Sequence, residues 1–182
     1  MKRTGFTLIE VAIVAVILGV MLMAVMVFTR STQNAYESVS QDTELTFNTR
    51  RAVERIADDL RRSDADHVTV DHTNPDYDSV ELQVPLLMKA GTVEWGAERE
   101  VGWKIQYLVE DGNLIRRVVD ASGVRMRMDE VLAVRVDSLW DGKKGFSITE
   151  NGDLLTLTVR VVSRDSGRRW WRQITTAVSL RN

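Results

Sequence analysis

Apolar residues are concentrated at the N-terminus of this chain, where residues 6–28 are almost all hydrophobic. Residues 11–28 carry no charge at all. At 1.5 Å per residue, residues 6–28 predict a helix of roughly 34 Å, which is long enough to cross the hydrocarbon layer of a membrane. Lys2 and Arg3 precede the apolar run. The positive-inside rule therefore predicts a cytoplasmic N-terminus, with the rest of the chain on the other side of the membrane.

After Arg30 the chain becomes polar but keeps a helical spacing, with neither proline nor glycine between Val20 and Arg62. An apolar stripe at helical spacing consists of Val53, Ile56, Ala57 and Leu60. The opposite face carries the charged residues Arg51, Glu54, Arg55, Asp58, Asp59 and Arg62. On this helix Glu54 can reach Arg51, and Asp58 can reach Arg55 or Arg62. The pattern predicts a helical stem over residues 30–62, whose charged face is either solvated or in contact with a neighbour in a fibre.

From Val68 onward the apolar residues alternate with polar ones, which is typical of strands. Asp111-Gly112 and Asn151-Gly152 are two-residue hairpin signals, and Ser166-Gly167 precedes a last strand. No helical pattern separates the strands, so the sheet should be largely antiparallel. We expect strands in the segments 80–84, 101–109, 114–119, 132–136, 146–149, 155–161 and 174–180. The predicted fold class is α+β: a long N-terminal helix packed on a largely antiparallel β-sheet head that comprises residues 63–182.

The composition narrows the classes of function. With 182 residues, 24 Lys+Arg and 26 Asp+Glu, the chain suits one ordinary domain with a net charge of −2. This balance argues against a dedicated nucleic-acid binder, which usually carries a basic excess. Because the chain has no cysteine, disulfides, thiolate zinc sites and thiol catalysis are excluded.

Glu10 is the one charge inside the apolar run. A carboxylate within a membrane costs about 2.5–3.5 kcal/mol on insertion scales, so it needs a compensating partner. No Lys, Arg or His within the membrane segment can supply one. We therefore expect the partner to come from another molecule, or Glu10 to lie close to the membrane interface. A secretory signal peptide fits poorly, because the small residue Gly5 precedes the apolar run.

The residues from Gly5 to Val11, Gly-Phe-Thr-Leu-Ile-Glu-Val, closely resemble the cleavage and methylation signature of type IV pilins and type II secretion pseudopilins. The resemblance implies that a prepilin peptidase cuts between Gly5 and Phe6 and that Phe6 is N-methylated. Residues 1–5 are then a cleaved leader and residues 6–29 a transmembrane and assembly helix. In that family the acid that matches Glu10 pairs with the N-terminal amine of a neighbouring subunit during assembly.

Three further segments look like those of the J-type minor pseudopilins and of the similar PilW-like minor pilins, namely residues 50–62, 107–116 and 178–182. The K-type minor pseudopilin differs because it lacks the acid that Glu10 supplies and is much longer. Many major pilins close a C-terminal loop with a disulfide, which is impossible here. Major subunits also usually carry a proline in the membrane helix, and this chain has none there.

The resemblance implies a minor pseudopilin of a type II secretion-like system, a non-enzymatic structural subunit at or near the tip of a periplasmic pseudopilus. It would help to initiate assembly and the export of folded proteins. The implied partners are other minor and major pseudopilins, the prepilin peptidase, the inner-membrane assembly platform and membrane lipid. Before processing, the protein would span the inner membrane once with its head in the periplasm. The alternatives are a minor pilin that primes a type IV pilus and, from another class, a membrane-anchored extracytoplasmic enzyme or binding protein.

The only histidines, His67 and His72, lie near several acids and suggest a divalent-metal site. These acids are Asp64, Asp66, Asp71, Asp76 and Asp78, and Asn74 alternates with the last two as calcium ligands can. The EF-hand glycine and terminal Glu are missing, so we expect a polar surface loop around Pro75 and neither metal nor cofactor. We find no motif of a catalytic site. The adjacent acids Asp58-Asp59 and Asp129-Glu130 should point in different directions.

The segment Arg168-Arg169-Trp170-Trp171-Arg172 is a basic and aromatic cluster. It could stack on single-stranded nucleic acid. The acidic balance of the chain instead favours a strand start with one tryptophan in the core and one at a subunit contact. Trp95, Trp103 and Trp140 are expected to be core or interface anchors.

Overall fold

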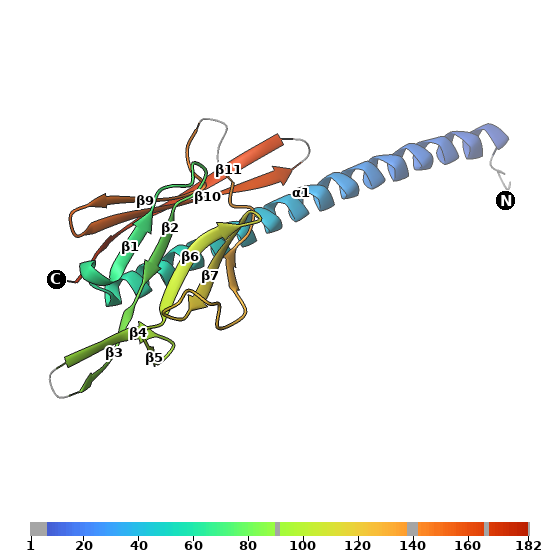
Figure 1. The fold of residues 1–182 in the computed structure, drawn as a ribbon. Helices are drawn as coiled ribbons and strands as arrows, with labels where there is room; N and C mark the ends of the chain where they lie inside the picture. The colour runs from blue at the N-terminus through green and yellow to red at the C-terminus, as the bar shows by residue number, and fades with distance from the viewer. Residues whose placement is uncertain (1–6, 90–91, 138–141, 166–167, 182) are drawn as a thin grey trace. The chain divides into compact units, whose positions relative to one another are not determined.

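The computed structural model describes residues 7–89, 92–137, 142–165 and 168–181 (Figure 1). The chain divides into two compact units, Met1–Asp42 and Thr43–Asn182, and each is described here by itself. Helix α1 (Leu8–Arg62) contributes to both units. It ends at Arg62, as the spacing predicted. The predicted cleavage and methylation residues Gly5 and Phe6 lie outside the described residues.

In the first unit, α1 exposes apolar side chains all round. The large hydrophobic residues from Leu8 to Phe28 are 50–89% exposed. By length and composition, this stretch of α1 can cross a membrane. An amphipathic helix would instead bury one apolar stripe against its own chain. The N-terminal half of α1 thus lacks the burial pattern of a core helix.

The second unit contains the short 3₁₀ helix η1 (Ala65–His67) and the strands of the head. The strands are β1 (Val68–Asp71), β2 (Ser79–Leu82), β3 (Val84–Lys89), β4 (Thr92–Ala97), β5 (Glu100–Val101), β6 (Lys104–Glu110), β7 (Asn113–Val119), β8 (Glu130–Ala133), β9 (Phe146–Asn151), β10 (Leu154–Asp165) and β11 (Arg168–Ser179). They form sheets in the orders β1-β2-β6-β7-β8, β11-β10-β9 and β3-β4-β5. Every pairing of named strands is antiparallel. The α+β class is confirmed, but the described strands form three sheets, whereas one was expected.

The single predicted run 80–84 divides at Gln83, and this division separates two of the sheets. The Gln83 side chain donates to the Trp103 carbonyl at 3.1 Å, and its backbone N–H donates to the His67 carbonyl at 3.0 Å. These bonds end β2 at Leu82, and β3 begins at Val84. The hairpin of β3 with β4 was not predicted.

Two other predicted strands are shorter than their patterns indicated. Gly102, with φ 81°, divides the run 101–109, so Val101 belongs to the short strand β5 and β6 begins at Lys104. The run 132–136 ends at Ala133, and Arg135 has a φ of 59°. Left-handed residues cannot continue a strand.

Both predicted two-residue hairpins are present. Asp111 and Gly112 have φ values of 50° and 72° between paired residues of β6 and β7, as a type I′ turn requires. In the second hairpin Asn151 pairs with Leu154, so the central residues are Gly152 and Asp153, one position later than expected. Of these two only Gly152 has a positive φ, which fits a type II′ turn.

The predicted apolar stripe of the stem is confirmed, because Val53, Ile56, Ala57 and Leu60 are all buried. They pack in one core with residues of β2, β6, β7, β9, β10 and β11. Asp59 was assigned to the charged outer face, and this assignment is wrong: it is only 3% exposed. Along a helix Asp59 follows Ala52 by seven residues and Ile56 by three, so it continues their buried face.

Candidate functional site

The first turn of α1 places Thr7 and Glu10 in direct contact. The Thr7 backbone N–H and the Thr7 hydroxyl both donate to the Glu10 carboxylate at 2.9 Å. The Glu10 backbone N–H lies 3.4 Å from the Thr7 hydroxyl oxygen, which accepts from it. This reciprocal pattern is a capping box, in which the third helical residue returns to the N-cap.

The capping box is a partner for Glu10 that sequence reasoning missed. A negative charge in the first turn also interacts favourably with the helix dipole. The motif Thr-x-x-Glu before an apolar run is a known start signal and could have revealed the contact. Two hydrogen bonds leave acceptor capacity on the carboxylate for a further donor. The arrangement can therefore cap its own helix and still bind a cation.

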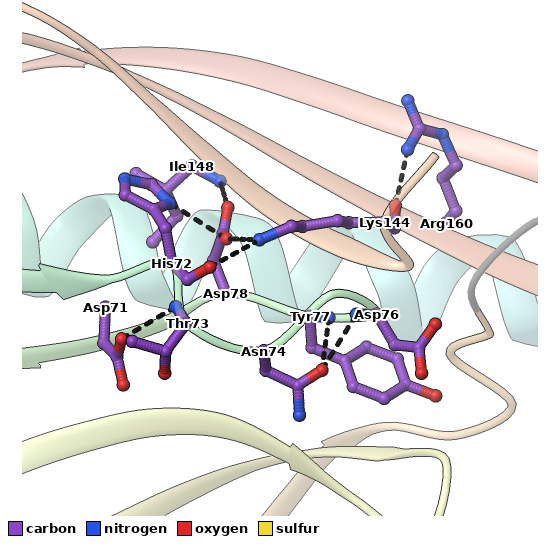
Figure 2. Close-up of polar contacts among 10 residues, drawn as sticks. All are labelled: Asp71, His72, Thr73, Asn74, Asp76, Tyr77, Asp78, Lys144, Ile148 and Arg160. Atoms are coloured by element: carbon purple, nitrogen blue, oxygen red, sulfur yellow. Dashed lines mark hydrogen bonds and ion pairs between the residues drawn. The ribbon is translucent and has the colours of Figure 1, made fainter. Parts of the chain in front are cut away.

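The two histidines have separate partners. His67 stacks on Trp95 with ring centroids 3.9 Å apart, and its Nδ1 lies 2.6 Å from the Asp64 carboxylate. His72 Nδ1 lies 2.9 Å from Asp78 (Figure 2). Among the described residues, no group of three or more His, Asp and Glu side chains is arranged to hold a metal ion.

Asp78 is a buried carboxylate with three donors around it (Figure 2). Lys144 Nζ lies 2.5 Å from Oδ1, and the Ile148 backbone N–H donates to Oδ2 at 2.7 Å. Burial raises the pKa of Asp78, but the hydrogen bonds from Lys144, Ile148 and His72 outweigh it and hold the pKa below its ordinary value. Asp78 thus links the loop that precedes β2 to two other segments. Ile148 connects it to β9, and Lys144 connects it to the segment before β9.

The remaining polar groups of this loop stabilise turns. Asn74 Oδ1 accepts from the backbone N–H groups of Asp76 and Tyr77 at 2.8 and 3.3 Å (Figure 2). Asp71 Oδ1 accepts from the Thr73 N–H at 2.9 Å. Such Asx contacts are what Asn and Asp ordinarily do in turns. The side chains of Asn74 and Asp78 thus have structural roles, and Asp76 contributes its backbone N–H.

The two adjacent acid pairs point apart, as expected, but the partner of Asp58 is neither Arg55 nor Arg62, the two arginines that it was predicted to reach. Asp58 pairs with Arg61 at 2.6 Å at the surface, and Asp59 is buried. Asp129 pairs with Arg117 at 2.7 Å, whereas Glu130 is exposed. Glu54 pairs with Arg50 at 3.0 Å, and not with Arg51 as predicted.

Asp59 belongs to a buried polar network that sequence reasoning missed. The Tyr107 hydroxyl donates to Asp59 Oδ2 at 2.6 Å, and Arg116 Nε lies 3.4 Å from the same oxygen. Arg116 Nη1 also donates to Glu98 at 3.0 Å. Burial and the Asp59 carboxylate raise the pKa of Tyr107, so the phenol stays protonated and acts as a donor.

The basic and aromatic cluster lies in β11. Trp171 is 53% exposed, which fits the predicted contact residue, while the side chains of residues 168–170 lie outside the described ones. Trp95 and Trp103 are partly buried. Trp140 lies outside the described residues.

Comparison with known proteins identifies a family motif at the N-terminus. Residues 1–26 match the family model of the prokaryotic N-terminal methylation motif, which is the signal of type IV pilins and pseudopilins. No curated protein and no solved structure matches the chain significantly. The motif and the long apolar helix are consistent with a single-pass protein anchored in the inner membrane. The chain therefore carries, on residues 1–26, the processing signal of a type IV pilin-like or pseudopilin protein.

Proposed function

We propose that this protein is a minor pseudopilin of a type II secretion-like system, at or near the tip of a periplasmic pseudopilus. Its role is structural: it helps to initiate assembly and the export of folded proteins, and it is not an enzyme. The observation that carries the proposal is Glu10, a carboxylate within the methylation motif at the start of α1, whose apolar side chains from Leu8 to Phe28 are exposed all round.

The proposed assembly step depends on the charge of Glu10. Cleavage after Gly5 creates an amine at Phe6, which is a cation that the unprocessed chain lacks at this position. In the assembly the amine of one subunit pairs with Glu10 of its neighbour inside the apolar helix bundle. A buried ion pair is costly to break once one partner is lost. The pair would therefore set the register between adjacent helices.

The head supplies the part of the subunit that partners contact. The absence of cysteine and of a proline in residues 6–28 favours a minor over a major subunit. A minor pilin that primes a type IV pilus is the second candidate, because the matched motif is common to both classes. The gene neighbourhood separates the two: secretin and secretion genes accompany a pseudopilin, and pilus retraction and adhesin genes accompany a pilin.

Intact-mass analysis of the protein extracted from membranes tests the processing. We expect the loss of Met1–Gly5 together with the gain of one methyl group on Phe6. A native chain that begins at Met1 would contradict the proposal and would favour a membrane-anchored enzyme or binding protein.

Three variants separate the charge of Glu10 from its capping role. Glu10→Gln keeps an oxygen that can cap the helix but removes the charge. Thr7→Val removes the hydroxyl donor and keeps the charge. If the ion pair matters, Glu10→Gln and Glu10→Ala should both be processed normally yet fail to cross-link to neighbouring subunits. Thr7→Val should be able to cross-link. Normal cross-linking of Glu10→Gln would show that capping alone is required, and the ion-pair mechanism would be wrong.

A further inference from the structure

A cavity of about 590 Å³ lies beside the last turns of α1. Its walls come from α1, the β3-β4-β5 sheet, β6, β7 and the loop after β7. Five arginines line it: Arg55, Arg62, Arg99, Arg116 and Arg127. Two carboxylates, those of Asp59 and Glu98, also lie in the lining. The positive charges thus outnumber the negative ones.

The two carboxylates form ion pairs with two of the arginines, Arg116 and Arg127. Asp59 lies 3.4 Å from Arg116 Nε. Glu98 bridges Arg116 at 3.0 Å and Arg127 at 2.9 Å. Asp59 and Arg116 are buried, so this group of two acids and two bases is balanced within the protein. A buried charge needs such pairing.

The other three arginines have no counter-charge among the residues that the structure describes. Among the described residues, none forms an ion pair or hydrogen bond with the guanidinium group of Arg55, Arg62 or Arg99, although all three line one cavity. Arg55 and Arg62 are seven residues apart on α1 and therefore share a face. All three arginines are exposed, so their charges are accessible to an anion from outside the chain.

The turn that carries Arg99 has an unusual backbone. Ala97 pairs with Glu100, so Glu98 and Arg99 are the central residues of a two-residue hairpin. Their φ values are 52° and 75°. Such turns ordinarily contain Asn or Gly, and a non-glycine residue in this region is strained. The strained turn contributes Glu98 and Arg99 together to the lining of the cavity.

The cavity also has apolar lining. Val84 and Ile105 are buried, and Leu86 is partly exposed. Guanidinium groups bind carboxylates in a bidentate manner. A volume of about 590 Å³ exceeds what one inorganic anion fills, and it falls within the range of pockets that hold larger ligands. Apolar surface next to unpaired arginines suits a peptide in which acidic and apolar side chains alternate.

We propose that this cavity binds an acidic segment of a neighbouring protein, whose carboxylates pair with Arg62 and Arg99 while its apolar side chains cover Leu86. The choice of a protein ligand rests on the proposed function, since a subunit of an assembly has neighbours. Binding itself is a property of the purified chain and does not require a fibre.

Isothermal titration calorimetry on the full chain in detergent tests the proposal. The probe is an acetylated and amidated peptide of alternating leucine and glutamate, and its glutamine counterpart is the control ligand. We expect the glutamate peptide to bind at least tenfold more tightly. Arg62→Gln and Arg99→Gln should each weaken binding about tenfold, which corresponds to about 1.4 kcal/mol, and higher salt should weaken it further.

Arg51→Gln is the matched control, because Arg51 is an exposed arginine of the same helix that lines a different cavity. It should change the affinity less than twofold. The proposal is overturned if the glutamate peptide does not bind, if the glutamine peptide binds equally, or if Arg51→Gln has the same effect as Arg62→Gln. Tighter binding of inorganic phosphate than of the peptide would also overturn it, in favour of a small-anion site. If the peptide binds but the chain in the cell begins at Met1, the pseudopilin function is refuted and the peptide-binding site is not.

Discussion

Removal of the Asp59 carboxylate should destabilise the head strongly, although the sequence pattern places Asp59 on the charged outer face of the helix. Asp59 is 3% exposed and accepts a hydrogen bond of 2.6 Å from Tyr107, which is fully buried. In Asp59→Ala the phenol loses its acceptor, which costs about 1–3 kcal/mol. Breaking a buried ion pair costs about 3–5 kcal/mol, but Arg116 keeps Glu98 as a partner at 3.0 Å. We therefore expect a loss of about 3 kcal/mol in the free energy of unfolding.

Two further variants measure how much of this loss comes from the contact between Asp59 and Tyr107. Tyr107→Phe removes one hydrogen bond and should cost about 1–1.5 kcal/mol. The double variant of Asp59→Ala with Tyr107→Phe should cost less than the sum, by about 1 kcal/mol, because no unsatisfied hydroxyl remains. Asp58→Ala is the neighbouring control: Asp58 is exposed and pairs only with Arg61 at the surface, so its loss should change stability by about 0.5 kcal/mol or less.

The assay is urea unfolding of a fragment of residues 43–182, followed by the intrinsic fluorescence of its five tryptophans. This fragment contains every residue of the buried core cluster. A structural role of the buried Asp59 carboxylate is excluded if the free energies of unfolding of Asp59→Ala and Asp58→Ala agree within about 1 kcal/mol, given the usual error of extrapolation from denaturant. Strict additivity of the double variant would refute the direct contact between Asp59 and Tyr107.

Two other predictions concern the head. The pKa of Asp78 lies below its ordinary value of 3.8, so its stabilising effect is fully present above about pH 4 and is lost as the pH falls through the lower folded value. Asp78→Asn should cost about 1.5–3 kcal/mol at pH 7 and should flatten the acid limb of stability measured by urea unfolding; an unchanged limb would contradict this. Gly112 has a φ of 72°, so Gly112→Ala should cost about 1–2 kcal/mol, and a thermal melt that matches the wild type would show that the turn tolerates a side chain.

Several parts of the fold could be predicted because their signals are local. The stripe from Val53 to Leu60 follows from helical periodicity, and the Asp111-Gly112 turn follows from the backbone freedom of those residue types. The hairpin around Gly152 was predicted one residue too early, because neighbouring Asn and Gly both favour turns and the strand pairing selects the register. The capping box of Thr7 and Glu10 is also local, because Thr-x-x-Glu before an apolar run is its sequence signature.

Other features depend on contacts between distant segments, and no local pattern contains them. Asp59 and Tyr107 are 48 residues apart, and the Asp78 carboxylate and the Ile148 amide are 70 residues apart. The turn of Glu98 and Arg99 contradicts the residue preferences of its type, so tertiary contacts must hold it.

By itself the sequence determined the membrane-length apolar helix, the processing motif and the antiparallel α+β class, because each depends on composition or on short-range periodicity. Only the tertiary structure decided how the strands divide into three sheets, which charges are buried and which arginines find no counter-charge among the described residues. The physical reason is that burial and charge pairing depend on which distant side chains meet, and these energies are large only where water is excluded.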